Sequence, residues 1–140
     1  MTFYFECHTN LHIMKLYFHA TSYQNALQII KNGFKKGKSG MFGAGIYFAE
    51  KPENALRKAL HPILDCIIIV IINIGRCKNE QFAHRNWNMQ IVNSLGYDSV
   101  EMRNCKTGPE ICIYDPKRIE MVSVVHWTQN NIEFNEISNL

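Results

Sequence analysis

One apolar run constrains the fold of this chain more than any other feature: residues 64–74, with the sequence LDCIIIVIINI. Its Ile and Val side chains favour strands over helices. Asp65 and Asn73 interrupt the run, which has about half of the roughly 20 residues that a membrane-crossing helix needs. We therefore predict a buried strand over Leu64–Ile74 and no membrane-spanning segment.

Other segments show the short apolar patterns of strands. In the first of them, Leu16 and Phe18 alternate with Tyr17. The expected strands are Lys15–His19, Ile46–Ala49, Tyr97–Met102, Glu110–Tyr114 and Ile119–Trp127.

Helices are expected in three places. The first is capped by Thr21 or Ser22, carries Tyr23, Ala26, Leu27 and Ile30 on one face, and stops at Gly33. The second starts at Pro52, buries Ala55, Leu56, Ala59 and Leu60, and ends at Pro62. A short third helix runs through Trp87, Ile91 and Leu95 to Gly96. Strands outnumber helices and gather in the second half of the chain, which favours an α+β domain over a doubly wound one.

Length and charge restrict the class of protein. The 140 residues fit one domain, expected over 1–140 with its core at about 15–127. A net charge of +3 is too small to indicate a nucleic-acid-binding protein, and most of the visible excess is a lysine cluster that we interpret as a solvated loop. The cluster consists of Lys31, Lys35, Lys36 and Lys38.

Cysteine usage indicates an intracellular protein. The five cysteines are odd in number and form no C-x-x-C pair, and Cys66 and Cys112 lie in apolar runs, where a thiol acts as a small hydrophobe. Zinc binding by cysteines with His8 or His12 stays an alternative that the spacings do not favour, so we expect no metal. The N-terminus MTFYFECHTN lacks the basic start of a signal peptide, and we expect a cytoplasmic or nuclear location.

A glycine-rich loop over Lys35–Gly45 leads directly into the strand Ile46–Ala49. Glycines placed so let the backbone approach a ligand or adopt positive φ, but the loop is equally typical of a loose turn. Two phosphate-binding motifs fail here. Residues 33–39 have three residues between the glycines where a P-loop needs four, and residues 40–45 show the dinucleotide fingerprint reversed and before a strand.

Three polar or aromatic residues occupy strand edges beside loops, a common location for functional groups. His19 ends its strand, Tyr47 follows the glycine loop and Glu110 opens an apolar strand. Each also has an ordinary structural interpretation: a satisfied histidine, a packed tyrosine and a solvated glutamate.

Three segments together resemble the catalytic domain of the poly(ADP-ribose) polymerase family of ADP-ribosyltransferases: FHATSYQNALQIIKNGF, GMFGAGIYFAE and GPEICIYDPKRI. The likeness extends from about Lys15 to Val125, and GMFGAGIYFA is its most specific part. The resemblance implies a fold of two packed, mainly antiparallel sheets with short flanking helices. It also implies NAD+ as co-substrate and a catalytic triad of His19, Tyr47 and Glu110.

The resemblance implies a role for each residue. His19 would bond an adenosine-side ribose hydroxyl, and Tyr47 would stack on nicotinamide. The backbone of Ala20 would hold the nicotinamide amide, Thr21 could reach a ribose hydroxyl, and Gly45 belongs to the same NAD+-binding set. Glu110 would bond the nicotinamide ribose, stabilise the oxocarbenium-like state and orient the nucleophile.

Two positions depart from the family pattern. Ala55 stands where a serine usually bonds the nicotinamide amide, and Lys58 stands where a second tyrosine usually stacks. These departures predict weaker NAD+ binding.

We expect transfer of single ADP-ribose units rather than polymers, because the loops near Lys35–Gly40 and Cys105–Pro109 are short. A protein acceptor is expected, with nucleic acid left open. The alternatives are a catalytically weak or inactive module that binds NAD+ or ADP-ribose, and an NAD+ glycohydrolase.

Overall fold

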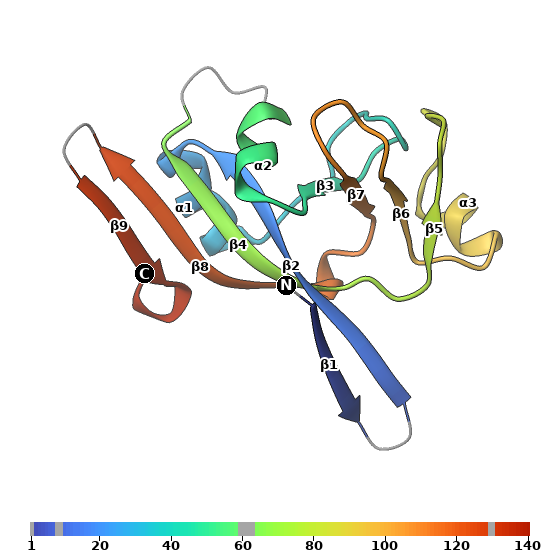
Figure 1. The fold of residues 1–140 in the computed structure, drawn as a ribbon, viewed down its shortest axis with the longest axis horizontal. Helices are drawn as coiled ribbons and strands as arrows, with labels where there is room; N and C mark the ends of the chain where they lie inside the picture. The colour runs from blue at the N-terminus through green and yellow to red at the C-terminus, as the bar shows by residue number, and fades with distance from the viewer. Residues whose placement is uncertain (1, 8–9, 59–63, 129–130) are drawn as a thin grey trace.

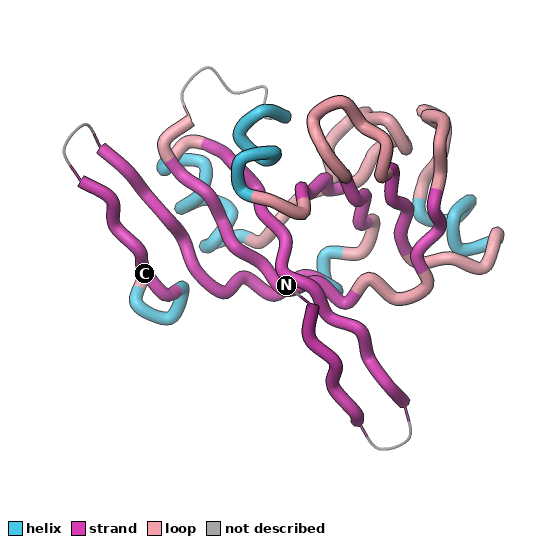
Figure 2. The backbone as a smooth tube through the Cα atoms, in the orientation of Figure 1, coloured by secondary structure: helices cyan, strands magenta, loops and turns pink. Residues whose placement is uncertain are grey.

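The apolar run forms the middle strand of one half of a sheet in the computed structural model, which describes residues 2–7, 10–58, 64–128 and 131–140. This strand, β4 (Cys66–Asn73), is somewhat shorter than predicted, and most of its side chains are buried. It pairs antiparallel with β2 (Asn10–Thr21) on one side and β8 (Ile119–Thr128) on the other. A mixed α+β architecture with few helices follows, as the sequence predicted (Figures 1 and 2).

The strands share one sheet in the order β5-β6-β7-β3-β2-β4-β8-β9, with β1 paired to β2 beside this path. Only β5 and β6 pair in parallel among the described strands. The remaining strands are β1 (Thr2–Cys7), β3 (Ile46–Ala49), β5 (Cys77–Asn79), β6 (Ser99–Met102), β7 (Glu110–Ile113) and β9 (Asn131–Glu136). Of these, β1, β5 and β9 were not predicted from the sequence.

The sheet is narrowest between β2 and β3, where the register contains the single pair Phe18 and Ala49. Figure 1 shows β4, β8 and β9 on one side of this junction and β7, β6 and β5 on the other. We expected two packed sheets, but the described strands are linked by hydrogen bonds into one. The link arises because β2 pairs with β4 along one edge and with β3 near its end.

Three α-helices accompany the sheet within the described residues: α1 (Tyr23–Asn32), α2 (Pro52–Lys58) and α3 (Met89–Ser94). Ser22 caps α1, because its hydroxyl accepts a hydrogen bond from the Asn25 amide, and Gly33 ends the helix at φ +82°. Short 3₁₀ turns follow at Pro116–Arg118 and Ile137–Asn139.

Two of the helix predictions need correction. Ala55 of α2 is buried as expected, but Leu56 is 36% exposed because it lies off the face that meets the sheet. Ala59, Leu60 and Pro62 lie outside the described residues. The helix α3 begins after Trp87, at an Asn88 cap, and ends before Leu95, which is the C-cap residue.

The largest hydrophobic cluster spans the narrow junction. Tyr17 of β2 and Ile68 of β4 pack in one cluster with Phe48 of β3 and Ile111 of β7. A second cluster, with Phe42, Val100 and Cys112, lies on the β6 and β7 side. The two groups of strands therefore share core residues even though their backbone link is narrow.

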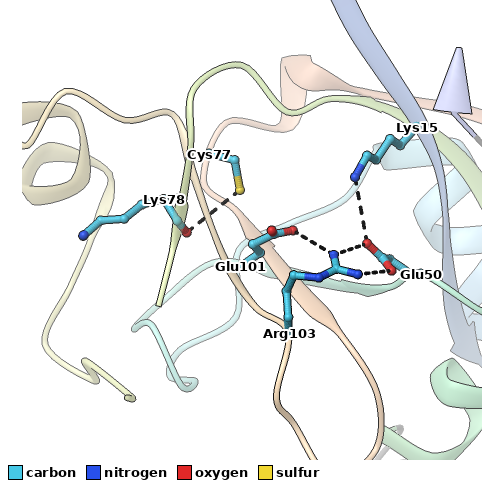
Figure 3. A network of polar contacts seen from close by, with 6 residues as sticks. All are labelled: Lys15, Glu50, Cys77, Lys78, Glu101 and Arg103. Atoms are coloured by element: carbon cyan, nitrogen blue, oxygen red, sulfur yellow. Dashed lines mark hydrogen bonds and ion pairs between the residues drawn. The ribbon is translucent and has the colours of Figure 1, made fainter. Parts of the chain in front are cut away.

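Charged side chains bridge the same junction (Figure 3). Arg103, just after β6, donates hydrogen bonds to both carboxylate oxygens of Glu50, at 2.8 and 3.4 Å, and Glu50 directly follows β3. Lys15 of β2 lies 3.9 Å from Glu50, and Glu101 of β6 lies 3.7 Å from Arg103. Because these side chains are partly exposed, each pair contributes at most about 1 kcal/mol to stability.

No helix in the part of the chain described here is long and apolar enough to cross a membrane.

Candidate functional site

A cavity of about 290 Å³ opens where β2, β3, α2 and β7 meet. Its lining includes all three predicted catalytic residues, His19, Tyr47 and Glu110, together with Ala20 and Thr21. These residues come from strands that are far apart in the sequence, and the antiparallel pairing of β3 with both β2 and β7 brings them together. The two departures from the family pattern, Ala55 and Lys58, line the same cavity.

A second cavity, of about 420 Å³, adjoins the first. His19 and Tyr47 line both cavities, so these two side chains lie at their common boundary. Gly45, the remaining predicted binding residue, lines only the second cavity, with Lys35 and residues of α1. The two cavities give the site two lobes, each large enough for part of an extended ligand.

His19 is an uncharged hydrogen-bond acceptor toward the cavities. Its ring meets Phe34 and Phe48 edge to face, with centroids 5.4 and 5.9 Å apart. Burial lowers the pKa of His19, and the hydrogen bond to the Tyr47 carbonyl opposes that shift only in part. Its Nδ1 lies 3.4 Å from this carbonyl oxygen, which can only accept a hydrogen bond, so Nδ1 carries the proton and Nε2 is left as an acceptor.

Tyr47 holds the glycine loop through its hydroxyl. The hydroxyl accepts a hydrogen bond from the Phe42 amide at 2.9 Å and donates one to the Gly43 carbonyl at 2.6 Å. Burial raises the pKa of Tyr47, so the phenol stays protonated. Gly40 lies so close to the Tyr47 ring that a Cβ atom there would overlap it. The ring is therefore fixed by the loop while it lines both cavities.

The glycines of the loop are required by packing against the protein itself. Gly43 has φ +80°, and a Cβ atom at this position would overlap the Trp87 carbonyl oxygen. At Gly45 a Cβ atom would overlap the Cys112 thiol. The interpretation as a loose turn is therefore wrong, and the expected positive φ is found at Gly43.

Glu110 forms an ion pair inside the first cavity. Its Oε2 lies 3.1 Å from Nζ of Lys58, the last residue of α2. The same ammonium donates hydrogen bonds to the Thr107 hydroxyl at 2.6 Å and to the Gly108 carbonyl at 2.8 Å. No pattern in the sequence predicts this contact, because the two residues lie on different elements whose proximity depends on the sheet order.

The chemical groups at the site suit a reaction in which positive charge develops. A carboxylate paired with an ammonium, an aromatic ring and an uncharged imidazole line the cavities, and a carboxylate near a developing cation lowers the energy of the transition state. Among residues 2–7, 10–58, 64–128 and 131–140, no group of three or more His, Cys, Asp or Glu side chains could hold a metal ion. Thiols near the site are protonated, since burial raises the pKa of Cys112 to about 12.

Comparison of the sequence with protein-family models gives no match, and comparison with curated proteins gives none.

Proposed function

We propose that the chain is an NAD+-dependent ADP-ribosyltransferase that cleaves the bond between nicotinamide and ribose and transfers ADP-ribose to an acceptor. The observation that carries the proposal is the convergence of His19, Tyr47 and Glu110, from β2, β3 and β7, on one cavity. The three motifs that resemble the poly(ADP-ribose) polymerase family supply these same three residues.

The two adjoining cavities suit the two halves of NAD+. The nicotinamide ring would occupy the first cavity against Tyr47, with its amide held by the backbone of Ala20. The adenosine half would occupy the second cavity, beside Gly45. His19 lies at the boundary, where its Nε2 can accept a hydrogen bond from a ribose hydroxyl. The hydroxyl of Thr21 is a further partner for a ribose hydroxyl.

The reaction needs one carboxylate and no strong general acid. The bond between the ribose carbon and the nicotinamide nitrogen breaks, and its electron pair stays with the ring, which leaves as a neutral molecule. The positive charge that develops on the ribose is stabilised by the Glu110 carboxylate. The acceptor nucleophile then forms the new bond to the ribose carbon and loses its proton to solvent water.

We extend the proposal to the fold, the product of the reaction and the cellular location. The strand groups on either side of the β2 and β3 junction would correspond to the two packed sheets of an ADP-ribosyltransferase. Transfer of single units to a protein is favoured over polymer formation, with nucleic acid as the other acceptor class. The protein would act in the cytoplasm or nucleus.

A second candidate function is an inactive module that binds NAD+ or ADP-ribose. Two observations favour it: Ala55 has no hydroxyl for the nicotinamide amide, and the Lys58 ammonium balances the charge of Glu110. A pure binding module has no need of a carboxylate at position 110, so substitution of Glu110 separates the two functions.

The test is incubation of the purified protein with adenine-labelled NAD+, with and without cell lysate, beside Glu110→Gln. Label fixed to a macromolecule by the wild type alone supports the transferase. Free ADP-ribose without fixed label indicates a glycohydrolase. Retained NAD+ binding without any consumption supports the inactive module.

A further inference from the structure

We infer that Lys58 is a positioning residue for the Glu110 carboxylate. The inference rests on the proposed function, because it concerns how the same carboxylate acts. It assigns Lys58 a purpose in transfer, whereas the sequence alone marks this residue only as a departure that weakens NAD+ binding.

Lys58 makes three close polar contacts through its ammonium group. An ammonium has three N–H donors and no acceptor. Three oxygens surround Nζ, those of Thr107, Gly108 and Glu110, at 2.6, 2.8 and 3.1 Å. The side chain is only 13% exposed, so water competes little for these donors. Lys58 is therefore held in place by two hydrogen bonds and one ion pair.

These contacts join α2 to the loop that precedes Glu110. Thr107 and Gly108 belong to this loop, which connects β6 and β7. A second close contact supports the connection, since a Cβ atom at Gly108 would overlap the side chain of Asn54, a buried residue of α2. Both Asn54 and Lys58 of α2 thus contact the loop that leads directly into β7 and Glu110.

The ion pair also gives the two carboxylate oxygens of Glu110 different roles. Lys58 holds Oε2 of Glu110, and Oε1 is the oxygen left to bond the ribose hydroxyl. A carboxylate fixed at one oxygen loses less rotational freedom when the other engages the substrate. The opposite view is that the ammonium inhibits the reaction by balancing the carboxylate charge, and it predicts that removal of Lys58 accelerates transfer.

The test compares Lys58→Met, Lys58→Arg and the control Arg57→Met by nicotinamide release from NAD+. Arg57 is an exposed cation on the same helix, so its replacement matches the charge change. Lys58→Met should lower kcat by up to about 100-fold, since an error of about 1 Å in position can cost that factor. The KM for NAD+ should stay near the wild-type value, Lys58→Arg should recover part of kcat, and Arg57→Met should behave as wild type.

A structural role alone would instead move kcat and the KM for NAD+ together. Should Lys58→Met fail to fold, Thr107→Val is the second variant. It removes one of the three oxygens around Nζ of Lys58 and should give a smaller fall in kcat at unchanged KM. An unchanged or higher kcat in the variant that folds would overturn the inference while the activity of the wild type upholds the proposed function. A wild type that releases no nicotinamide would overturn both.

Discussion

The protonation state of His19 follows from the two aromatic rings and the carbonyl that surround it, and it makes stability depend on pH. Burial lowers its folded-state pKa below the ordinary 6.5. As the pH falls through about 6.5, the unfolded chain binds a proton first, so the free energy of unfolding decreases until the pH passes the folded-state pKa. Between pH 7.5 and pH 5, values chosen to span roughly this window, urea unfolding should show a smaller decrease in the free energy of unfolding for His19→Gln than for the wild type. Parallel curves for the two proteins would contradict a buried neutral histidine.

Tyr47 combines a ring that lines the cavities with a hydroxyl that holds the glycine loop, and two substitutions separate these roles. Tyr47→Phe loses the bonds to Phe42 and Gly43 and should cost about 1–2 kcal/mol of unfolding free energy, while the ring still stacks. Tyr47→Ala should also weaken NAD+ binding by about 1–3 kcal/mol, the usual value of one stacked aromatic. Calorimetric titration measures the NAD+ affinity of each variant. Equal NAD+ affinity of Tyr47→Ala and the wild type would show that the ring does not contribute to binding.

At the scale of elements, the glycine loop depends on a close approach that a matched pair of glycines can test. Gly43 and Gly96 both have positive φ, +80° and +91°, but only Gly43 lies against a backbone carbonyl, that of Trp87. Gly96→Ala should cost about 1–2 kcal/mol from the left-handed conformation alone. Gly43→Ala adds overpacking to this cost and should lose about 2–5 kcal/mol in total. Thermal unfolding compares them, and similar losses would mean that the loop adapts to a side chain.

The elements that could be predicted from the sequence are those whose signals are local. Ser22 and Gly33 mark both ends of α1, because a cap and a positive φ are properties of neighbouring residues. The strand β5 has only three residues, CKN, too few for any alternation to show. In β9 the apolar Ile132 and Phe134 are 73% and 64% exposed, so its pairing to β8 depends on backbone hydrogen bonds rather than burial.

At the scale of the whole molecule, the site is a product of the strand order. The motifs were sufficient to predict that His19, Tyr47 and Glu110 would share a cavity, since the resemblance groups them. They could not predict the partner of Glu110, because the contact with Lys58 requires α2 and the loop before β7 to meet. The motifs also could not predict the single sheet, because one residue pair, Phe18 with Ala49, decides whether the two strand groups are linked.

The narrow junction raises the question of whether the two strand groups unfold together, and two buried cysteines can answer it. Cys66 of β4 and Cys112 of β7 lie on opposite sides of the junction, and both are 0% exposed. Burial raises the pKa of each thiol to about 12, so neither reacts with an alkylating reagent while the protein is folded. Their alkylation rates therefore report the opening of each group separately.

We expect the two opening free energies to agree with each other and with the free energy of global unfolding. The largest core cluster contains Ile68 from one group and Ile111 from the other, so neither group can open without exposing the shared core. Mass spectrometry of alkylated peptides measures each site, and half-buried Cys105 serves as the control that should react faster through local opening. A clearly lower opening free energy at one of the two buried thiols would show that the junction separates two units. The site between them would then depend on how those units meet.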